Sequence, residues 1–139
     1  MGLLADIYLA KTDAEAVKYD AAPGGFTDSL QYKGITELQL STLWASVLGV
    51  KWELKFIKPF TAIFHTDGGA RLICRLPAAM LNDMVKLTPE QISGAADKWA
   101  ATAEMRCKPS DALPIVEGLA VCARKAIESE QNVYLWNSV

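Results

Sequence analysis

Residues 60–76 read FTAIFHTDGGARLICRL and set the predicted architecture, because two strand-like runs flank the turn signal Asp67-Gly68-Gly69. A three-residue loop at this turn puts side chains of similar character opposite each other, in the pairs Thr61–Arg75, Ala62–Cys74, Ile63–Ile73, Phe64–Leu72 and His65–Arg71. A two-residue loop would instead set Phe64 opposite Arg71, and a slip of one residue turns every side chain to the other face. We therefore expect an antiparallel hairpin with the three-residue loop.

Alternating apolar side chains predict further strands at the two ends of the chain. Residues 3–10 have aliphatic side chains at every second position, the period of a strand with one buried face. Residues 133–136 close the chain in the same way. Residues 52–57 also alternate and are interpreted as a short strand before Pro59, whereas the Pro- and Gly-containing residues 21–34 are interpreted as a loop.

Helix signals occupy most of the remaining chain. Capping pairs predict helix starts at Thr12, Thr36 and Thr88, and Gly49 supplies a stop for the second of these helices. Two more helices are predicted over residues 78–86 and 111–130. Pro114 is expected in or before the first turn of the last helix, because an interior proline removes a backbone hydrogen bond.

These elements predict a single α+β domain over residues 1–139. The order of strand, helix, strands, helices and strand favours a mainly antiparallel sheet with the helices packed on one face. A length of 139 residues fits one domain. Parallel pairing of the two terminal strands is the alternative topology.

Composition argues against several classes of partner and location. Fourteen basic against sixteen acidic residues give a net charge of -2, the wrong sign for a nucleic-acid-binding protein. No apolar run is long enough for a transmembrane helix, and the first residues resemble neither a signal peptide nor a myristoylation site. Three cysteines without a C-x-x-C pair indicate reduced thiols in the cytoplasm. Neither metal-ligand spacing nor a phosphate-binding glycine loop occurs, so no metal or cofactor is expected.

The face of the sheet opposite the helices gathers the candidate site. The predicted register brings together polar and aromatic side chains there: Asp6, Tyr8, Thr61, His65, Arg71, Arg75, Tyr134 and Trp136. Arginine offers a planar fork to carboxylates and phosphates, and aromatic rings supply rigid contact area. The simpler interpretation is an ion pair between Asp6 and Arg71 or Arg75 on a solvated face, which needs no function.

His65 is the only histidine and therefore the only side chain whose ordinary pKa suits proton transfer near neutral pH. No nucleophile signature surrounds it. A histidine at the end of a strand, beside a turn, is the interpretation we prefer over a catalytic role.

Four segments resemble a group of small uncharacterised bacterial proteins of the mobile-cassette or immunity type. They are ADIYLA at 5–10, YKGITEL at 32–38, LSTLWA at 40–45 and YLWNSV at 134–139. The resemblance spans most of the chain and implies a toxin-neutralising or similar partner-binding role. It assigns no site residue.

Three functional hypotheses follow. The first is a cytoplasmic protein-interaction module of the immunity type that binds an acidic partner through the face of Arg71 and Arg75. The alternative is a protein or enzyme that binds a small anionic ligand on the same face, roofed by residues 21–34, with His65 as acid or base. The third is a structural protein that forms a homodimer through an edge strand.

Overall fold

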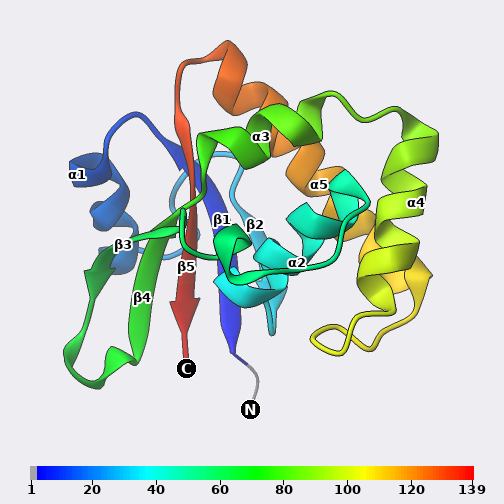
Figure 1. Ribbon diagram of the computed structural model, residues 1–139. Helices are drawn as coiled ribbons and strands as arrows, with labels where there is room; N and C mark the ends of the chain where they lie inside the picture. The colour runs from blue at the N-terminus through cyan, green and yellow to red at the C-terminus, as the bar shows by residue number, and fades with distance from the viewer. Residues whose placement is uncertain (1–2) are drawn as a thin grey trace.

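Five antiparallel strands form one sheet in the computed structural model, which describes residues 3–139 (Figure 1). Their order across the sheet is β2-β1-β5-β4-β3, with the bounds β1 Leu4–Ala10, β2 Leu30–Lys33, β3 Thr61–His65, β4 Arg71–Arg75 and β5 Asn132–Ser138. The terminal strands β1 and β5 pair antiparallel at the centre, from Leu4 with Ser138 to Ala10 with Asn132. The antiparallel sheet and the α+β class are confirmed, and the parallel alternative is wrong.

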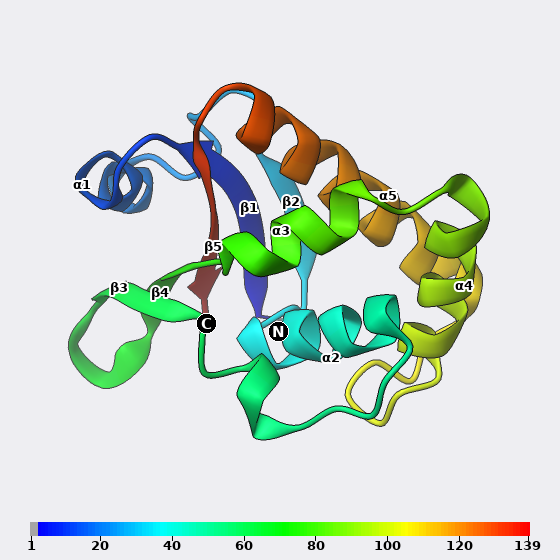
Figure 2. The same cartoon turned by 45° about the horizontal axis from the view of Figure 1, so that its top comes forward.

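The helices divide unequally between the two faces of the sheet. The four longer helices cover one face, and α1 lies on the other side of the sheet together with the 3-10 helix η1 (Figures 1 and 2). Their bounds are α1 Asp13–Ala16, η1 Val17–Ala21, α2 Glu37–Leu48, α3 Ala78–Val85, α4 Pro89–Ala100 and α5 Pro109–Glu128. Packing of helices on one face therefore holds for α2 to α5 and not for α1.

The local sequence explains where the helices begin and end. Thr36 and Thr88 each form a full capping box with a glutamine three residues on, and Gly49 ends α2 in the left-handed region at φ 68°. The expectation for Pro114 was wrong, because α5 begins at Pro109 and Pro114 is its sixth residue. Pro114 lies on the exposed side of α5, where the carbonyl that loses its backbone partner can bind water.

The main core lies between α2 to α5 and the sheet. Trp99 is fully buried there, and its indole Nε1 donates to the Gln39 carbonyl at 2.9 Å and to the Thr42 hydroxyl at 3.1 Å. The inward side of each central strand completes this core through Ala5, Ile7, Val133 and Leu135, as the alternation predicts.

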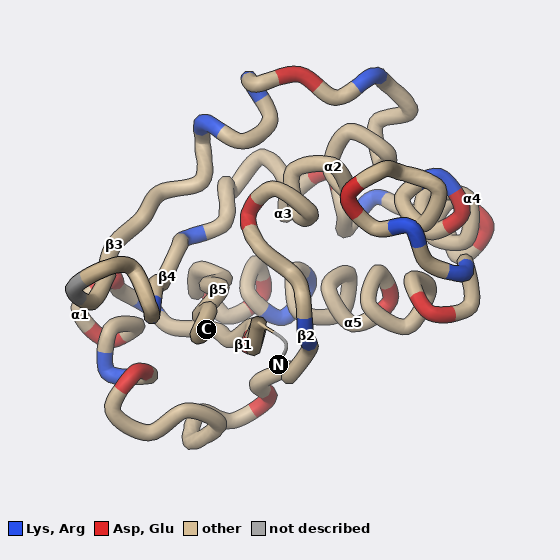
Figure 3. The backbone as a smooth tube through the Cα atoms, turned by 90° about the horizontal axis from the view of Figure 1, so that it is seen from below, with Lys and Arg blue, Asp and Glu red and all other residues tan. Residues whose placement is uncertain are grey.

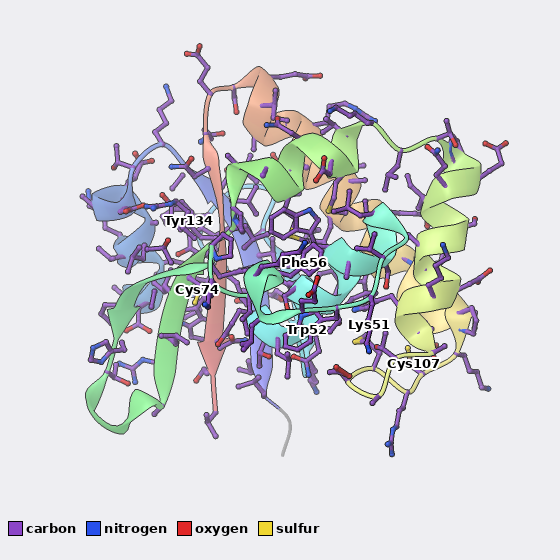
Figure 4. The ribbon with its side chains drawn as sticks, in the orientation of Figure 1. Lys51, Trp52, Phe56, Cys74, Cys107 and Tyr134 are labelled. Atoms are coloured by element: carbon purple, nitrogen blue, oxygen red, sulfur yellow. The ribbon has the colours of Figure 1, made fainter. Side chains whose placement is uncertain are left out.

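Two segments differ from their predicted structure. Residues 54–56 form the 3-10 helix η2 rather than a strand, and this turn buries Phe56 edge-on to Trp44 while Leu54 points to solvent (Figure 4). Within the predicted loop 21–34, residues 30–33 form the edge strand β2. Both errors concern runs of three or four residues, which are too short for periodicity to identify.

The hairpin of β3 and β4 forms with a different register near its turn. Thr61 pairs with Arg75 and Ala62 with Cys74 as predicted, but Ile63 is an extra residue on β3, so Phe64 pairs with Ile73 and His65 with Leu72. The amide of Thr66 then donates to the Arg71 carbonyl, which leaves four residues in the loop instead of three. A bulge of this kind is common on an edge strand such as β3.

Candidate functional site

The second face of the sheet carries a cluster of stacked aromatic rings. It consists of Tyr8, Tyr134 and Trp136 from the central strands and Tyr19 and Phe26 from the chain above them. The rings of Tyr8 and Tyr19 stack with centroids 4.0 Å apart, and Trp136 lies 5.9 Å from Tyr19. Tyr8, Tyr134 and Trp136 lie on the predicted face, but all three are buried beneath residues 12–26, which we call the covering segment.

Tyrosine hydroxyls attach the covering segment to the sheet. Tyr8 donates to the Ala16 carbonyl at 2.7 Å, and Tyr134 extends from β5 to donate to the Asp13 carboxylate at 2.7 Å (Figure 4). Burial, and the hydrogen bond to Asp13, raise the pKa of Tyr134 to about 12. This hydroxyl therefore keeps its proton at neutral pH and acts as a donor.

Both candidate arginines are paired with carboxylates of the covering segment. Arg71 Nε donates to Asp20 Oδ1 at 2.8 Å, and the same oxygen accepts from the Trp136 indole. Arg75 forms an ion pair with Asp13, which lowers the pKa of that carboxyl. The predicted pairing of either arginine with Asp6 is wrong, because the partners come from a segment whose position the strand pattern does not indicate.

Basic and acidic residues also alternate along the backbone near α1 (Figure 3). The positive charge of Arg71 and Arg75 is therefore compensated within the protein.

His65 lies apart from the other candidate residues. Because cross-strand partners share a face, its pairing with Leu72 turns it away from the face of Arg71 and Arg75. The side chain is exposed. Thr61, which the bulge does not displace, shares a face with Arg75 as predicted.

A cavity of about 440 Å³ occupies the part of the second face that the covering segment leaves uncovered. Its lining, which we call the Asp6 pocket, consists of Leu4, Asp6, Pro23, Gln31, Tyr32, Lys33 and Trp136. The volume falls within the range of about 300–1,000 Å³ typical of small-molecule sites. Strands β1 and β5 supply the floor, β2 supplies one rim and Pro23 of the covering segment supplies a wall.

Asp6 is the polar group at the base of this pocket. The residue is only 5% exposed, and Oδ2 accepts a hydrogen bond from the Tyr19 hydroxyl at 2.7 Å. Burial raises the pKa of Asp6, and the hydrogen bond from Tyr19 opposes that rise. The carboxylate is thus held in one orientation without a cationic side chain beside it in residues 3–139.

The pocket combines residues that the sequence indicated with residues that it did not. Asp6 and Trp136 were predicted, whereas Gln31 and Lys33 were missed because their strand was taken as a loop. The alternation Leu30-Gln31-Tyr32-Lys33 is the signal that could have identified them. Leu30 and Tyr32 pack on the main core, so Gln31 and Lys33 point to the pocket.

Comparison of the chain with protein-family models, curated proteins and solved structures finds no match. The resemblance to mobile-cassette or immunity proteins therefore stays a prediction. Across residues 3–139, no three His, Cys, Asp or Glu side chains come together as a metal site. In the same residues, no helix has both the length and the apolar character needed to cross a membrane.

Proposed function

We propose that the protein binds a small organic ligand with an anionic group in the Asp6 pocket. The observation that carries the proposal is the composition of this cavity, in which apolar walls surround a few polar groups. Small-molecule sites have this composition. Lys33 at the rim is the residue that would bind the anionic group, because an exposed ammonium on a flexible stem can reach toward a ligand.

The interaction hypothesis has less support in the same structure. A surface that attracts an acidic protein needs positive charge that is free to pair with it. Arg71 and Arg75 are instead bonded to Asp20 and Asp13, so an acidic partner would have to displace two carboxylates that belong to the protein. The proposal therefore assigns Arg71 and Arg75 to holding the covering segment in place, which builds one wall of the pocket.

The proposal is one of binding, and it gives His65 no role as acid or base because His65 lies on the other face of the sheet. We also propose a cytoplasmic location. The three cysteines are free thiols, two of them buried, as expected for a protein from a reducing compartment.

Titration with small carboxylates, followed by NMR, tests the proposal. The probes are 4-methylbenzoate and 3-phenylpropanoate, each with one carboxylate on an apolar body. We expect them to shift the indole N–H resonance of Trp136, which is assigned from the peak that Trp136→Phe removes.

The matched control compares two lysines. Lys33→Met is expected to weaken binding, and Lys58→Met, which changes an exposed lysine outside the pocket, is expected to leave it intact. Equal binding by the two variants, or no movement of the Trp136 resonance with either probe, contradicts the proposal.

A further inference from the structure

The unused oxygen of Asp6 carries a more specific inference about the ligand. Tyr19 satisfies Oδ2, and no hydrogen-bond donor from residues 3–139 is assigned to Oδ1. No fully buried side-chain oxygen or nitrogen in those residues lacks a partner. Oδ1 therefore keeps contact with the space that Asp6 lines, as an acceptor at the floor of the pocket.

We infer that the ligand is a zwitterion, whose cationic nitrogen donates to Asp6 Oδ1 while its anionic group binds Lys33. The inference rests on the proposed function and adds to it the positively charged end of the ligand. Leu4, Pro23 and Trp136 would contact the apolar body between the two charged groups.

The strand register places the two charged residues at a distance that a small molecule can bridge. Asp6 pairs with Gln31, and Leu4 pairs with Lys33, so Asp6 and Lys33 are diagonal neighbours across β1 and β2. Diagonal neighbours have Cβ atoms about 7–8 Å apart or slightly less. No ion pair joins Asp6 to Lys33 in the described residues, so the two charges are available to one ligand.

A comparison of the three carboxylates associated with this face supports a cationic partner for Asp6. Asp13 and Asp20 each have an arginine beside them, and Asp6 is more deeply buried than either. A buried charge is costly unless it is paired and hydrogen-bonded. Asp6 has the hydrogen bond from Tyr19 but no cation from the described chain, and an ammonium group of the ligand would complete the site.

The remaining contacts of the pocket suit an organic cation. No metal-ligand cluster occurs in residues 3–139, so a single carboxylate faces the cavity beside apolar side chains. The indole of Trp136 is fixed by its bond to Asp20, which holds the ring as a wall beside which a ligand can lie. An ammonium can also interact favourably with such a ring face.

Two matched sets of probes test the inference. 4-(Aminomethyl)benzoate is compared with 4-methylbenzoate and 4-methylbenzylamine, and L-phenylalanine with 3-phenylpropanoate and 2-phenylethylamine. In each set the second and third molecules lack one charged group of the first. Titrations that follow the Trp136 indole resonance give a dissociation constant for each probe.

At least one zwitterion is expected to bind about tenfold more tightly than both of its singly charged analogues, which corresponds to about 1.4 kcal/mol. Asp6→Asn should reduce its affinity to that of the carboxylate, and Lys33→Met should reduce it to that of the amine. Asp97→Asn removes an exposed carboxylate on α4 and should change nothing. NMR spectra of each variant establish that the fold is retained.

The outcomes separate this inference from the proposed function. If the carboxylates bind as well as both zwitterions, the inference is wrong and the proposed anion site stands. If the zwitterion binds and Asp6→Asn has no effect, the assignment of Asp6 is wrong. If no probe moves the Trp136 resonance, both proposals fail.

Discussion

Removal of one hydroxyl, in Tyr19→Phe, should destabilise the protein by an amount that depends on pH. The Tyr19 ring stacks on Tyr8 in either variant, so only the 2.7 Å hydrogen bond to Asp6 is lost. A hydrogen bond to a charged group contributes about 1.5–3 kcal/mol, and one between neutral groups about 0.5–1.5 kcal/mol. Because burial raises the pKa of Asp6, the larger range applies at pH 7 and the smaller where Asp6 is protonated.

The expected effect is large enough to measure by conventional denaturation. Unfolding entropy of about 2.1 cal/mol/K per residue makes 1 kcal/mol equivalent to about 3 °C in a chain of this length. Tyr19→Phe should therefore lower the Tm by about 5–10 °C at pH 7. Urea titrations at pH 7 and pH 3.5 should show that the loss of unfolding free energy is about 1 kcal/mol smaller at the lower pH.

Tyr8→Phe is the matched control. Its hydroxyl is equally buried and also makes a 2.7 Å hydrogen bond, but it donates to the neutral Ala16 carbonyl. The cost of Tyr8→Phe should therefore be the same at both pH values. If Tyr19→Phe costs the same at pH 7 and pH 3.5, or no more than Tyr8→Phe at pH 7, then Asp6 is not a buried carboxylate that depends on Tyr19.

Three further variants test other parts of the fold. Gly118→Ala should destabilise the protein by about 1–3 kcal/mol in urea, because the new Cβ would lie 2.6 Å from a tyrosine hydroxyl, while Gly94→Ala meets open space and should stabilise it by up to about 1 kcal/mol. The ion pair with Arg75 lowers the pKa of Asp13, so its stabilisation is present above the ordinary carboxyl pKa and is lost as pH falls through the lowered one; Arg75→Met should make acid unfolding titrations less steep. Burial raises the pKa of two cysteine thiols to about 12, so Ellman's reagent should modify Cys107 first, and Cys107→Ser should remove that fast phase.

Local chemistry made much of the fold predictable. Capping at Thr36 and Thr88 is decided within four residues, and the period of two in β1 and β5 reports which side chains face the core. The same alternation correctly placed Tyr8, Tyr134 and Trp136 on one face of the sheet. These predictions succeeded because each depends on neighbours in the sequence.

The failures depend on contacts between distant segments. An extra residue at Ile63 turned His65 to the other face, and the character of paired side chains could not reveal it because both registers match apolar with apolar residues. The partners of Arg71 and Arg75 come from more than fifty residues upstream. The pocket needed β2, a four-residue edge strand whose pairing with β1 fixes where Lys33 lies.

The balance of charges on the second face connects the fold to the proposed ligand. Asp13 and Asp20 are paired with arginines, and their lowered pKa values mean that both favour the folded state at neutral pH. Asp6 has the opposite linkage: its raised pKa means that its contribution to stability falls as pH rises through that value. Folding alone therefore favours a neutral side chain at this position. An ammonium bound at Oδ1 would offset that cost, so the same carboxylate that weakens the empty protein would strengthen its complex.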